Sequence, residues 1–195
     1  MVLWHLPSAG VFKINVHSTF FAEHHCVGLG MMVRDCEGQA IAARSKKIFG
    51  LFSPVVVEAM AFQFALGIAY DLGLHSVEME GDSVEVVNAL LSNEALFSPF
   101  GLIIKDIQSD ASQFFDVVSF SHIRHEGNEL AHGFARHTKN VEDFTLNAHQ
   151  TGEEMLETRD FEMGILGSVR FAGNETLETL KFSRVKTLEG YNPES

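Results

Sequence analysis

The sequence is short of positive charge. It carries 14 Lys and Arg residues against 26 Asp and Glu residues, so its formal net charge is −12. The imbalance runs along the whole chain, because residues 1–145 hold 9 basic and 17 acidic residues and residues 146–195 hold 5 and 9. An acidic surface repels phosphate groups, which argues against strong non-specific binding of nucleic acid. Any contact with nucleic acid must depend on a local basic strip or on metal ions.

Cysteines, targeting signals and long apolar runs are also scarce. The two cysteines, Cys26 and Cys36, do not form a CxxC pair, which favours a reduced intracellular protein. Residues 1–8 have no basic segment and no long apolar stretch, so we expect neither a secretory signal nor a membrane-spanning run. These absences predict a protein of the cytoplasm or nucleus that is not secreted and does not bind membranes.

Several common catalytic motifs are missing. The chain has no Gly-x-Ser-x-Gly elbow and no Walker motif. Gly28 and Gly30 lack the third glycine and the following helix of a dinucleotide-binding fingerprint. The sequence therefore gives no support to a serine hydrolase, a nucleotide triphosphatase or a dinucleotide-dependent enzyme.

The elements that the sequence does contain alternate between strands and helices. Hydrophobic residues make up 46% of the chain, which is enough for a full core. Strands are predicted at residues 11–17, 27–33, 40–48, 75–80 and 117–123, and helices from Pro54 to about 72, from 82 or 83 to about 91, from Pro99 to about 115 and at 126–136. This order predicts an α/β fold with a five-stranded mixed sheet, three antiparallel strands followed by two parallel strands, and helices on both faces.

Two details of this prediction bear on the site. Residues 11–17 alternate, with Phe12, Ile14 and Val16 on the expected core face, which predicts a half-buried strand followed by a turn over 18–26. Residues 1–10 form an N-terminal extension and residues 11–140 the domain. Residues 141–195 have scattered apolar residues without a long period, which predicts a weakly structured extension that can hold one ordered segment.

Five short motifs stand in these elements. They are KINVH at 13–17, VRDCEG at 33–38, EAMAF at 58–62, EGDS at 80–83 and FSHIRHEGNELAH at 120–132. In this order and with these gaps, the chain resembles the ribonuclease H-like domain, and it looks closest to the plant reverse transcriptase-like branch. The resemblance implies a ribonuclease H fold. It also implies an endonuclease that cleaves the RNA strand of RNA–DNA hybrids with two divalent ions, usually Mg²⁺, held by four acidic residues.

Two of the four positions that this resemblance assigns to metal ligands hold histidine. Glu58 stands at the position of the first-helix Glu and Asp82 at that of the fourth-strand Asp. His17 stands where the first strand supplies the Asp that bridges both ions, and His132 where the last helix supplies an Asp. His122 matches, by its spacing to the last helix, a mobile histidine that assists product release. The implied catalytic residues are thus Glu58, Asp82, His122 and His132, and the implied metal set is His17, Glu58, Asp82 and His132.

The two histidines change what this site can hold. An imidazole offers one neutral nitrogen and cannot bridge two ions as a carboxylate does, and Mg²⁺ prefers oxygen ligands. We therefore expect weak Mg²⁺ binding and weak or lost hydrolysis, as in a pseudoenzyme. By resemblance the cofactor is Mg²⁺ or Mn²⁺, and the simplest interpretation is a decayed site with no metal. A sharper hypothesis is a single transition-metal site in which His17, Glu58, Asp82 and His132 hold Zn²⁺, Mn²⁺ or Fe²⁺, with zinc the less favoured ion.

Purely structural roles explain some of these residues equally well. Glu58 also fits an acid in the first turn of a helix, and Asp82 fits an N-cap. His132 also fits a partly buried structural histidine, and His122 and His125 fit plain loop residues. These alternatives stay open at the level of sequence.

Three functions compete on this evidence. The first is weak binding of an RNA–DNA hybrid or another nucleic acid, with backbone contacts from Lys13, Arg34, Arg44, Lys46, Lys47 and Arg124. A solvated strand end explains the dense patch Arg44, Lys46 and Lys47 about as well. The second is a residual Mn²⁺-dependent nuclease that works through Glu58 and Asp82. The third is a non-catalytic scaffold that binds protein through its acidic surface or its tail.

Overall fold

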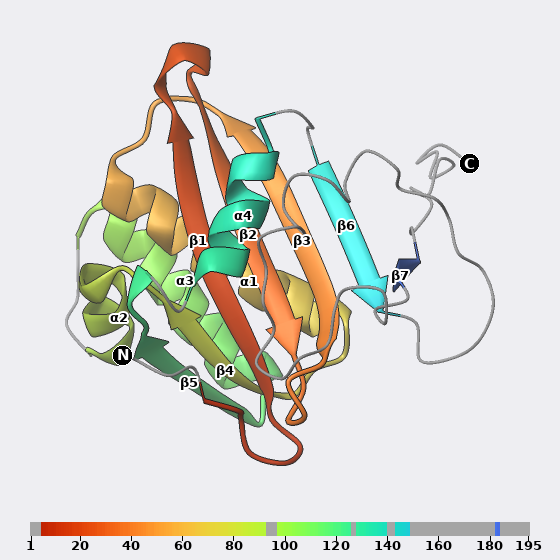
Figure 1. The fold of residues 1–195 in the computed structure, drawn as a ribbon. Helices are drawn as coiled ribbons and strands as arrows, with labels where there is room; N and C mark the ends of the chain where they lie inside the picture. The colour runs from red at the N-terminus through yellow and green to blue at the C-terminus, as the bar shows by residue number, and fades with distance from the viewer. Residues whose placement is uncertain (1–4, 93–96, 126–127, 140–142, 149–181, 184–195) are drawn as a thin grey trace, which may run out of the picture.

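A mixed β-sheet forms the centre of the molecule (Figure 1). The computed structural model describes residues 5–92, 97–125, 128–139, 143–148 and 182–183. Strands β1 (Phe12–Phe21), β2 (Cys26–Arg34) and β3 (Ala40–Phe49) are antiparallel, and β4 (Ser76–Gly81) and β5 (Val117–His122) run parallel to β1 in the order β5-β4-β1-β2-β3. The predicted five-stranded mixed sheet is confirmed.

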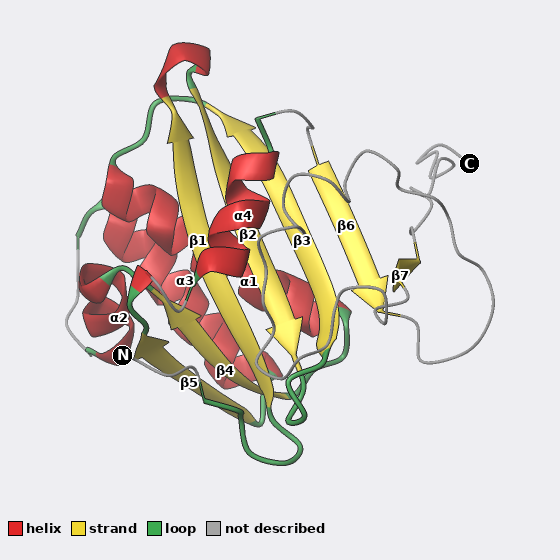
Figure 2. Cartoon of the chain, viewed as in Figure 1, coloured by secondary structure: helices red, strands yellow, loops and turns green. Residues whose placement is uncertain are grey.

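Helices cover both faces of this sheet (Figure 2). Helices α1 (Pro54–Asp71), α2 (Val84–Leu91) and α3 (Pro99–Phe114) lie on one face, with α1 against β1 and β2. Helix α4 (Glu129–His137) crosses the other face over β1, β2 and β3. The two layers place the start of α1 and the middle of α4 on opposite sides of β1, and the candidate site forms between them.

Helix α1 owes its apolar composition to the core. By length and composition alone this helix could cross a membrane, because its mean hydropathy is 1.2. The sequence itself predicts no membrane-spanning run. Its side chains Val57, Phe62 and Leu66 are buried in the hydrophobic core that also contains Ile14 and Val16 of β1. Packing on the sheet therefore accounts for this apolar stretch without a membrane.

The first hairpin differs from the expectation in two ways. Residues 18–21 continue β1 instead of forming a turn, because Ser18 to Phe21 stay in register with β2 as far as the pair Phe21 and Cys26. A short 3-10 turn, Ala22–His24, and His25 in the left-handed conformation (φ 46°) close the hairpin. Strand β1 is also buried on both faces over residues 13–18, and not half-buried, because α4 packs over its later part and the N-terminal segment contacts Lys13 through the carbonyl oxygen of His5.

Two further strands extend the sheet beyond β3. Strand β6 (Asp143–Ala148) pairs antiparallel with β3, and β7 (Phe182–Ser183) pairs with β6. They lie within the segment for which the sequence predicts a weakly structured extension. Their pairing supplies hydrogen bonds to the edge of β3, which the apolar pattern of that segment did not reveal. The remaining residues of the predicted extension lie outside the described part of the chain.

Helix α4 lies unusually close to β2. A Cβ atom added to Gly30 would meet the backbone of Ala131 and Ala135, and one added to Gly28 would meet Ala135 and Thr138. The glycines that weaken β2 as an isolated strand are thus required by the helix above it. This close approach sets the height of His132 over the sheet.

Candidate functional site

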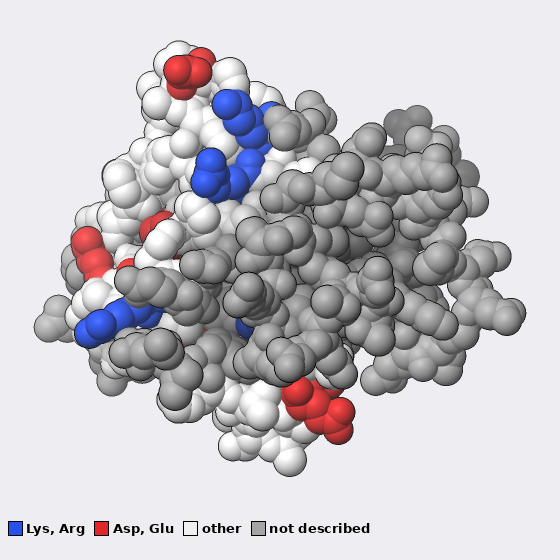
Figure 3. Space-filling model, viewed as in Figure 1, with Lys and Arg blue, Asp and Glu red and all other residues white. Residues whose placement is uncertain are grey.

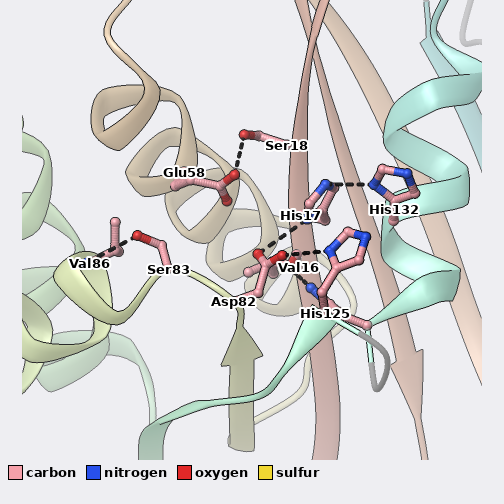
Figure 4. Close-up of polar contacts among 10 residues, drawn as sticks. Val16, His17, Ser18, Glu58, Asp82, Ser83, Val86, His125 and His132 are labelled. Atoms are coloured by element: carbon pink, nitrogen blue, oxygen red, sulfur yellow. Dashed lines mark hydrogen bonds and ion pairs between the residues drawn. The ribbon is translucent and has the colours of Figure 1, made fainter.

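Five side chains from four parts of the chain converge beside β1 (Figure 4). His17 projects from β1 toward α4 and is only 7% exposed. Asp82 directly follows β4, which is the parallel neighbour of β1. Glu58 lies near the start of α1, His132 lies in α4, and His125 lies in the loop that precedes α4.

Asp82 holds two of the histidines. Its Oδ1 lies 3.2 Å from Nδ1 of His17, and its Oδ2 lies 3.0 Å from Nδ1 of His125. On the other side of the His17 ring, Nε2 lies 2.7 Å from Nδ1 of His132. Figure 4 shows the resulting chain of contacts from Asp82 through His17 to His132, with the His125 ring beside it.

Glu58 approaches the same cluster from the α1 side. The hydroxyl of Ser18 donates a 2.6 Å hydrogen bond to its Oε1. Its Oε2 is buried and has no hydrogen-bond partner among the described residues. Burial raises the pKa of Glu58, with the Ser18 hydrogen bond acting in the opposite direction. A ligand atom of Glu58 lies within 4.8 Å of ligand atoms of both His17 and Asp82.

The cluster shifts two further pKa values. Burial acts to raise the pKa of Asp82, but the hydrogen bonds with His17 and His125 outweigh it and lower that pKa to about 2. Burial, together with the neighbouring His17 and His125 rings, lowers the pKa of His132 to about 4. At neutral pH the site therefore contains an ionised carboxylate at Asp82 and a neutral imidazole at His132.

The structure places the four residues of the implied metal set in two overlapping groups that share His17. Glu58 and Asp82 lie with His17 in one group and His132 lies with His17 and His125 in the other, and their roles as ligands or catalytic groups stay predictions. His122, the predicted mobile histidine, is exposed at the end of β5 and, within the described residues, lies outside the cluster. Instead His125 reaches Asp82. The only sequence signal for it was its place in the HIRH motif, where spacing alone does not distinguish two histidines three residues apart.

Two of the residues predicted to contact nucleic acid are buried in the structure. Lys13 is 2% exposed, and its Nζ lies 2.8 Å from Oε1 of Glu80. Arg34 is 8% exposed, and its Nη1 donates a 2.8 Å hydrogen bond to Oδ1 of Asn15. Both cations lie on the face of the sheet that α4 covers, so they hold a buried network together instead of facing a phosphate.

The dense patch on β3 is divided between two faces. Ser45 and Lys47 pair with Gly30 and Gly28 of β2, so Lys47 lies on the α4 face, whereas Arg44 and Lys46 lie on the other face. Lys46 and Arg124 are exposed. Figure 3 shows few Lys and Arg side chains on the α4 side, gathered mainly around the end of that helix. Exposed Arg136 and Lys139 stand there, and Nζ of Lys47 lies 3.4 Å from the carbonyl oxygen of Lys139.

Several solved structures with this fold are ribonucleases H. The chain is 20% identical to ribonuclease H1 from the halophilic archaeon Halobacterium salinarum, covering 67% of this chain and 98% of that one with a TM-score of 0.58. It is 20% identical to the N-terminal RNase H domain of a Mycobacterium tuberculosis protein, over 68% and 95% of the two chains, with a TM-score of 0.59. A third structure, LC11-RNase H1 in complex with an RNA/DNA hybrid, gives 20% identity over 65% and 94%, with a TM-score of 0.58. No curated protein sequence matches the chain.

These similarities define the fold class, an α/β protein of the ribonuclease H type. The family model described as "Reverse transcriptase-like" matches residues 15–138, which is more than half of the chain. The chain therefore belongs to the reverse transcriptase-like family, and it shares the fold of ribonucleases H. Membership of the plant branch stays a prediction.

The donor set does not fit the pair of magnesium ions that this fold usually uses. Only two carboxylates, Glu58 and Asp82, are present among the described residues of the cluster. Both oxygens of Asp82 contact imidazole nitrogens, and one oxygen of Glu58 accepts from Ser18. A magnesium pair needs carboxylates that can bridge two ions, and these contacts leave too few free oxygens to do so.

Proposed function

We propose that this chain is a nucleic-acid-binding domain of the ribonuclease H type whose magnesium-dependent hydrolysis is weak or lost. One observation carries the proposal. The positions of the bridging acid and of the last-helix acid hold His17 and His132, and their rings contact each other at 2.7 Å between Nε2 and Nδ1. A pair of imidazoles in contact occupies the place where two negative charges would be needed to hold two Mg²⁺ ions.

The expected partner is an RNA–DNA hybrid, bound weakly. Support comes from the fold, since the similar LC11-RNase H1 was solved with an RNA/DNA hybrid. The net charge of −12 and the burial of Lys13 and Arg34 leave few cations for phosphates. Binding that depends on few cations is weak and has a shallow salt dependence.

A binding experiment tests the first half of this proposal. The full chain is titrated against a labelled RNA–DNA hybrid in chelator, from low salt to physiological salt. We expect measurable binding at low salt and a several-fold loss in the Arg124→Ala variant, because exposed Arg124 adjoins the His125 loop. Exposed Lys105 of α3 gives the matched control, and Lys105→Ala should change little. No binding even at the lowest salt would reject a nucleic-acid function.

A cleavage experiment tests the second half. We expect no hybrid cleavage with Mg²⁺ by the unmodified chain. The double variant His17→Asp plus His132→Asp restores both acids and should gain Mg²⁺-dependent cleavage, and adding Glu58→Gln should abolish that gain. The same assay with Mn²⁺ tests the residual nuclease that works through Glu58 and Asp82. Efficient Mg²⁺ cleavage by the unmodified chain, abolished by Glu58→Gln, would show that hydrolysis is intact.

Protein binding is the second candidate function, and the net charge of −12 favours it. An acidic surface suits a basic protein partner better than a nucleic acid. A basic partner bound with equal affinity after residues 141–195 are deleted would assign binding to the domain surface. Loss of binding would assign it to that extension.

A further inference from the structure

We propose that His17, His125 and His132 bind a single transition-metal ion of the Zn²⁺ type, with Asp82 orienting two of the three rings. The site does not depend on whether the chain binds nucleic acid. It also differs from the set that the sequence suggested, because His125 enters and Glu58 leaves. A single Zn²⁺-type ion would thus occupy the place where the magnesium pair does not fit.

The three rings already converge. Ligand atoms of His17, His125 and His132 lie within 4.8 Å of one another. The ring centroids lie 4.6 to 5.5 Å apart, and the rings meet edge to face at 62 to 74° instead of stacking. Zn–N distances of about 2.0–2.1 Å in a tetrahedral site put ligand nitrogens about 3.3–3.4 Å apart. The 2.7 Å pair of His17 and His132 must open by about 0.6 Å to reach that spacing.

Asp82 fixes which nitrogens are available. An ionised carboxylate can only accept hydrogen bonds, so Nδ1 of both His17 and His125 must carry the proton that each ring donates to Asp82. In the neutral rings, their Nε2 atoms then carry lone pairs. A carboxylate behind the distal nitrogen of a histidine is the usual outer support of a zinc ligand.

The contact between His17 and His132 supplies the second observation. Nε2 of His17 points at Nδ1 of His132, 2.7 Å away. The His17 side chain is almost fully buried. Without an ion, these two nitrogens are joined by a single proton, carried either by Nε2 of His17 or by Nδ1 of His132. A metal ion takes the place of that proton and satisfies both lone pairs at once.

The same contacts explain the choice of ligands and of ion. Oε1 of Glu58 is engaged by Ser18 and both oxygens of Asp82 are engaged by the rings, which leaves Oε2 of Glu58 as the one unengaged oxygen of the two carboxylates, so the donor set is rich in nitrogen. A nitrogen-rich set favours Zn²⁺ over Mg²⁺. The side chain of His125 is 57% exposed, which gives the ion a path from solvent and leaves one position open to water.

The experiment measures metal binding directly on the full chain. Chelator-treated protein is titrated with Zn²⁺ by calorimetry, and with Co²⁺ by visible absorption. We expect one equivalent to bind, and His125→Ala, His132→Ala and Asp82→Asn each to weaken Zn²⁺ affinity by at least about tenfold. His24→Ala removes an exposed histidine at the hairpin and is the matched control, with unchanged affinity expected. Glu58→Gln should also leave Zn²⁺ affinity unchanged, which separates this site from the set containing Glu58.

Three results would overturn the proposal. They are no stoichiometric Zn²⁺ binding, an equal loss of affinity in His24→Ala and His125→Ala, and loss of binding in Glu58→Gln. Thermal unfolding in chelator shows whether each variant folds, and His125→Ala, which changes an exposed loop residue, keeps the test valid if His132→Ala does not. Hybrid binding measured in chelator is a separate readout, so a failure of the metal site and a failure of the proposed nucleic-acid function are distinguishable.

Discussion

Two polar clusters lie on the same face of β1, and they differ in how completely their charges are matched. At one end Lys13 contacts Glu80, Glu80 accepts from Asn15, and Asn15 accepts from Arg34. At the other end His17 connects Asp82 with His132. We call the first the charge network and the second the histidine cluster. Every member of the first is buried, whereas the second has an exposed member, His125.

This difference suggests that the charge network has a structural role and that the histidine cluster is a candidate binding site. Every member of the charge network is buried, and its positive groups face a carboxylate or an amide. Burial lowers the pKa of Arg34 to about 10, with the charge of Glu80 acting against that change. A closed network of this kind specifies packing. The histidine cluster has more nitrogen donors than carboxylates and opens to solvent, which is what a ligand-binding site requires.

The largest expected effect comes from breaking the charge network. Glu80→Gln leaves Lys13 and Arg34 buried without their carboxylate, which should lower the free energy of unfolding by about 3–5 kcal/mol. Urea unfolding measures this change. Glu78→Gln is the control, since Glu78 also lies 3.4 Å from Nζ of Lys13 but is 30% exposed, and it should cost less than about 1 kcal/mol. Equal costs in the two variants would show that the network is not a buried structural unit.

A smaller effect is expected from separating α4 from the sheet. Gly30→Ala places a methyl group against the backbone of Ala131 and Ala135, and the helix must shift. Overpacking of this kind costs about 1–3 kcal/mol. Because His132 moves with α4, Zn²⁺ affinity should fall as well, although no ligand is changed. The exposed Gly67 of α1, where an added Cβ meets nothing, is the control, and Gly67→Ala should not destabilise the chain.

The comparison also shows what the sequence could predict. The spacing of apolar residues predicts the order of strands and helices. The EGDS motif follows a strand, and neighbouring parallel strands end at the same edge of a sheet, so the sequence also predicts that Asp82 lies beside β1. Alternation placed His17 correctly opposite the Ile14 and Val16 face. Local patterns determine these features, so a single sequence contains them.

The rest depends on tertiary packing. Alternation says that Lys13 and Arg34 lie on the polar face, but only tertiary contacts, such as that of Lys13 Nζ with the carbonyl oxygen of His5, show that this face is buried. In the same way, the loop before α4 decides that His125 and not His122 reaches Asp82. Strand β6 was missed because its partner, the edge of β3, is about a hundred residues away in sequence. Long-range contacts of this kind leave no local period.

A modest effect on stability is expected from removing the hydrogen bond between Ser18 and Glu58. Ser18→Ala removes the 2.6 Å hydrogen bond to Oε1 and leaves both oxygens of a buried carboxyl without that support. The free energy of unfolding should fall by about 1 kcal/mol, and the pKa of Glu58 should rise further. Urea unfolding at neutral pH measures the loss. Ser112→Ala, which removes only an exposed hydrogen bond within α3, should stay within about 0.5 kcal/mol of the unmodified chain.

The smallest effect concerns pH. The pKa of His132 is lowered from its ordinary value of 6.5 to about 4, so between these values the unfolded chain binds a proton that the folded ring does not. Folding stability in chelator should therefore fall as the pH drops from about 6.5 to 4, and be fully present above that window. Because the ring is partly exposed, water screens this contribution and keeps it small. The slope of urea midpoint against pH should flatten in His132→Gln and stay unchanged in the exposed-histidine control His24→Gln. An identical slope in the unmodified chain and His132→Gln would mean that α4 does not hold this imidazole in its neutral form, and the histidine cluster would then resemble the charge network more than a site.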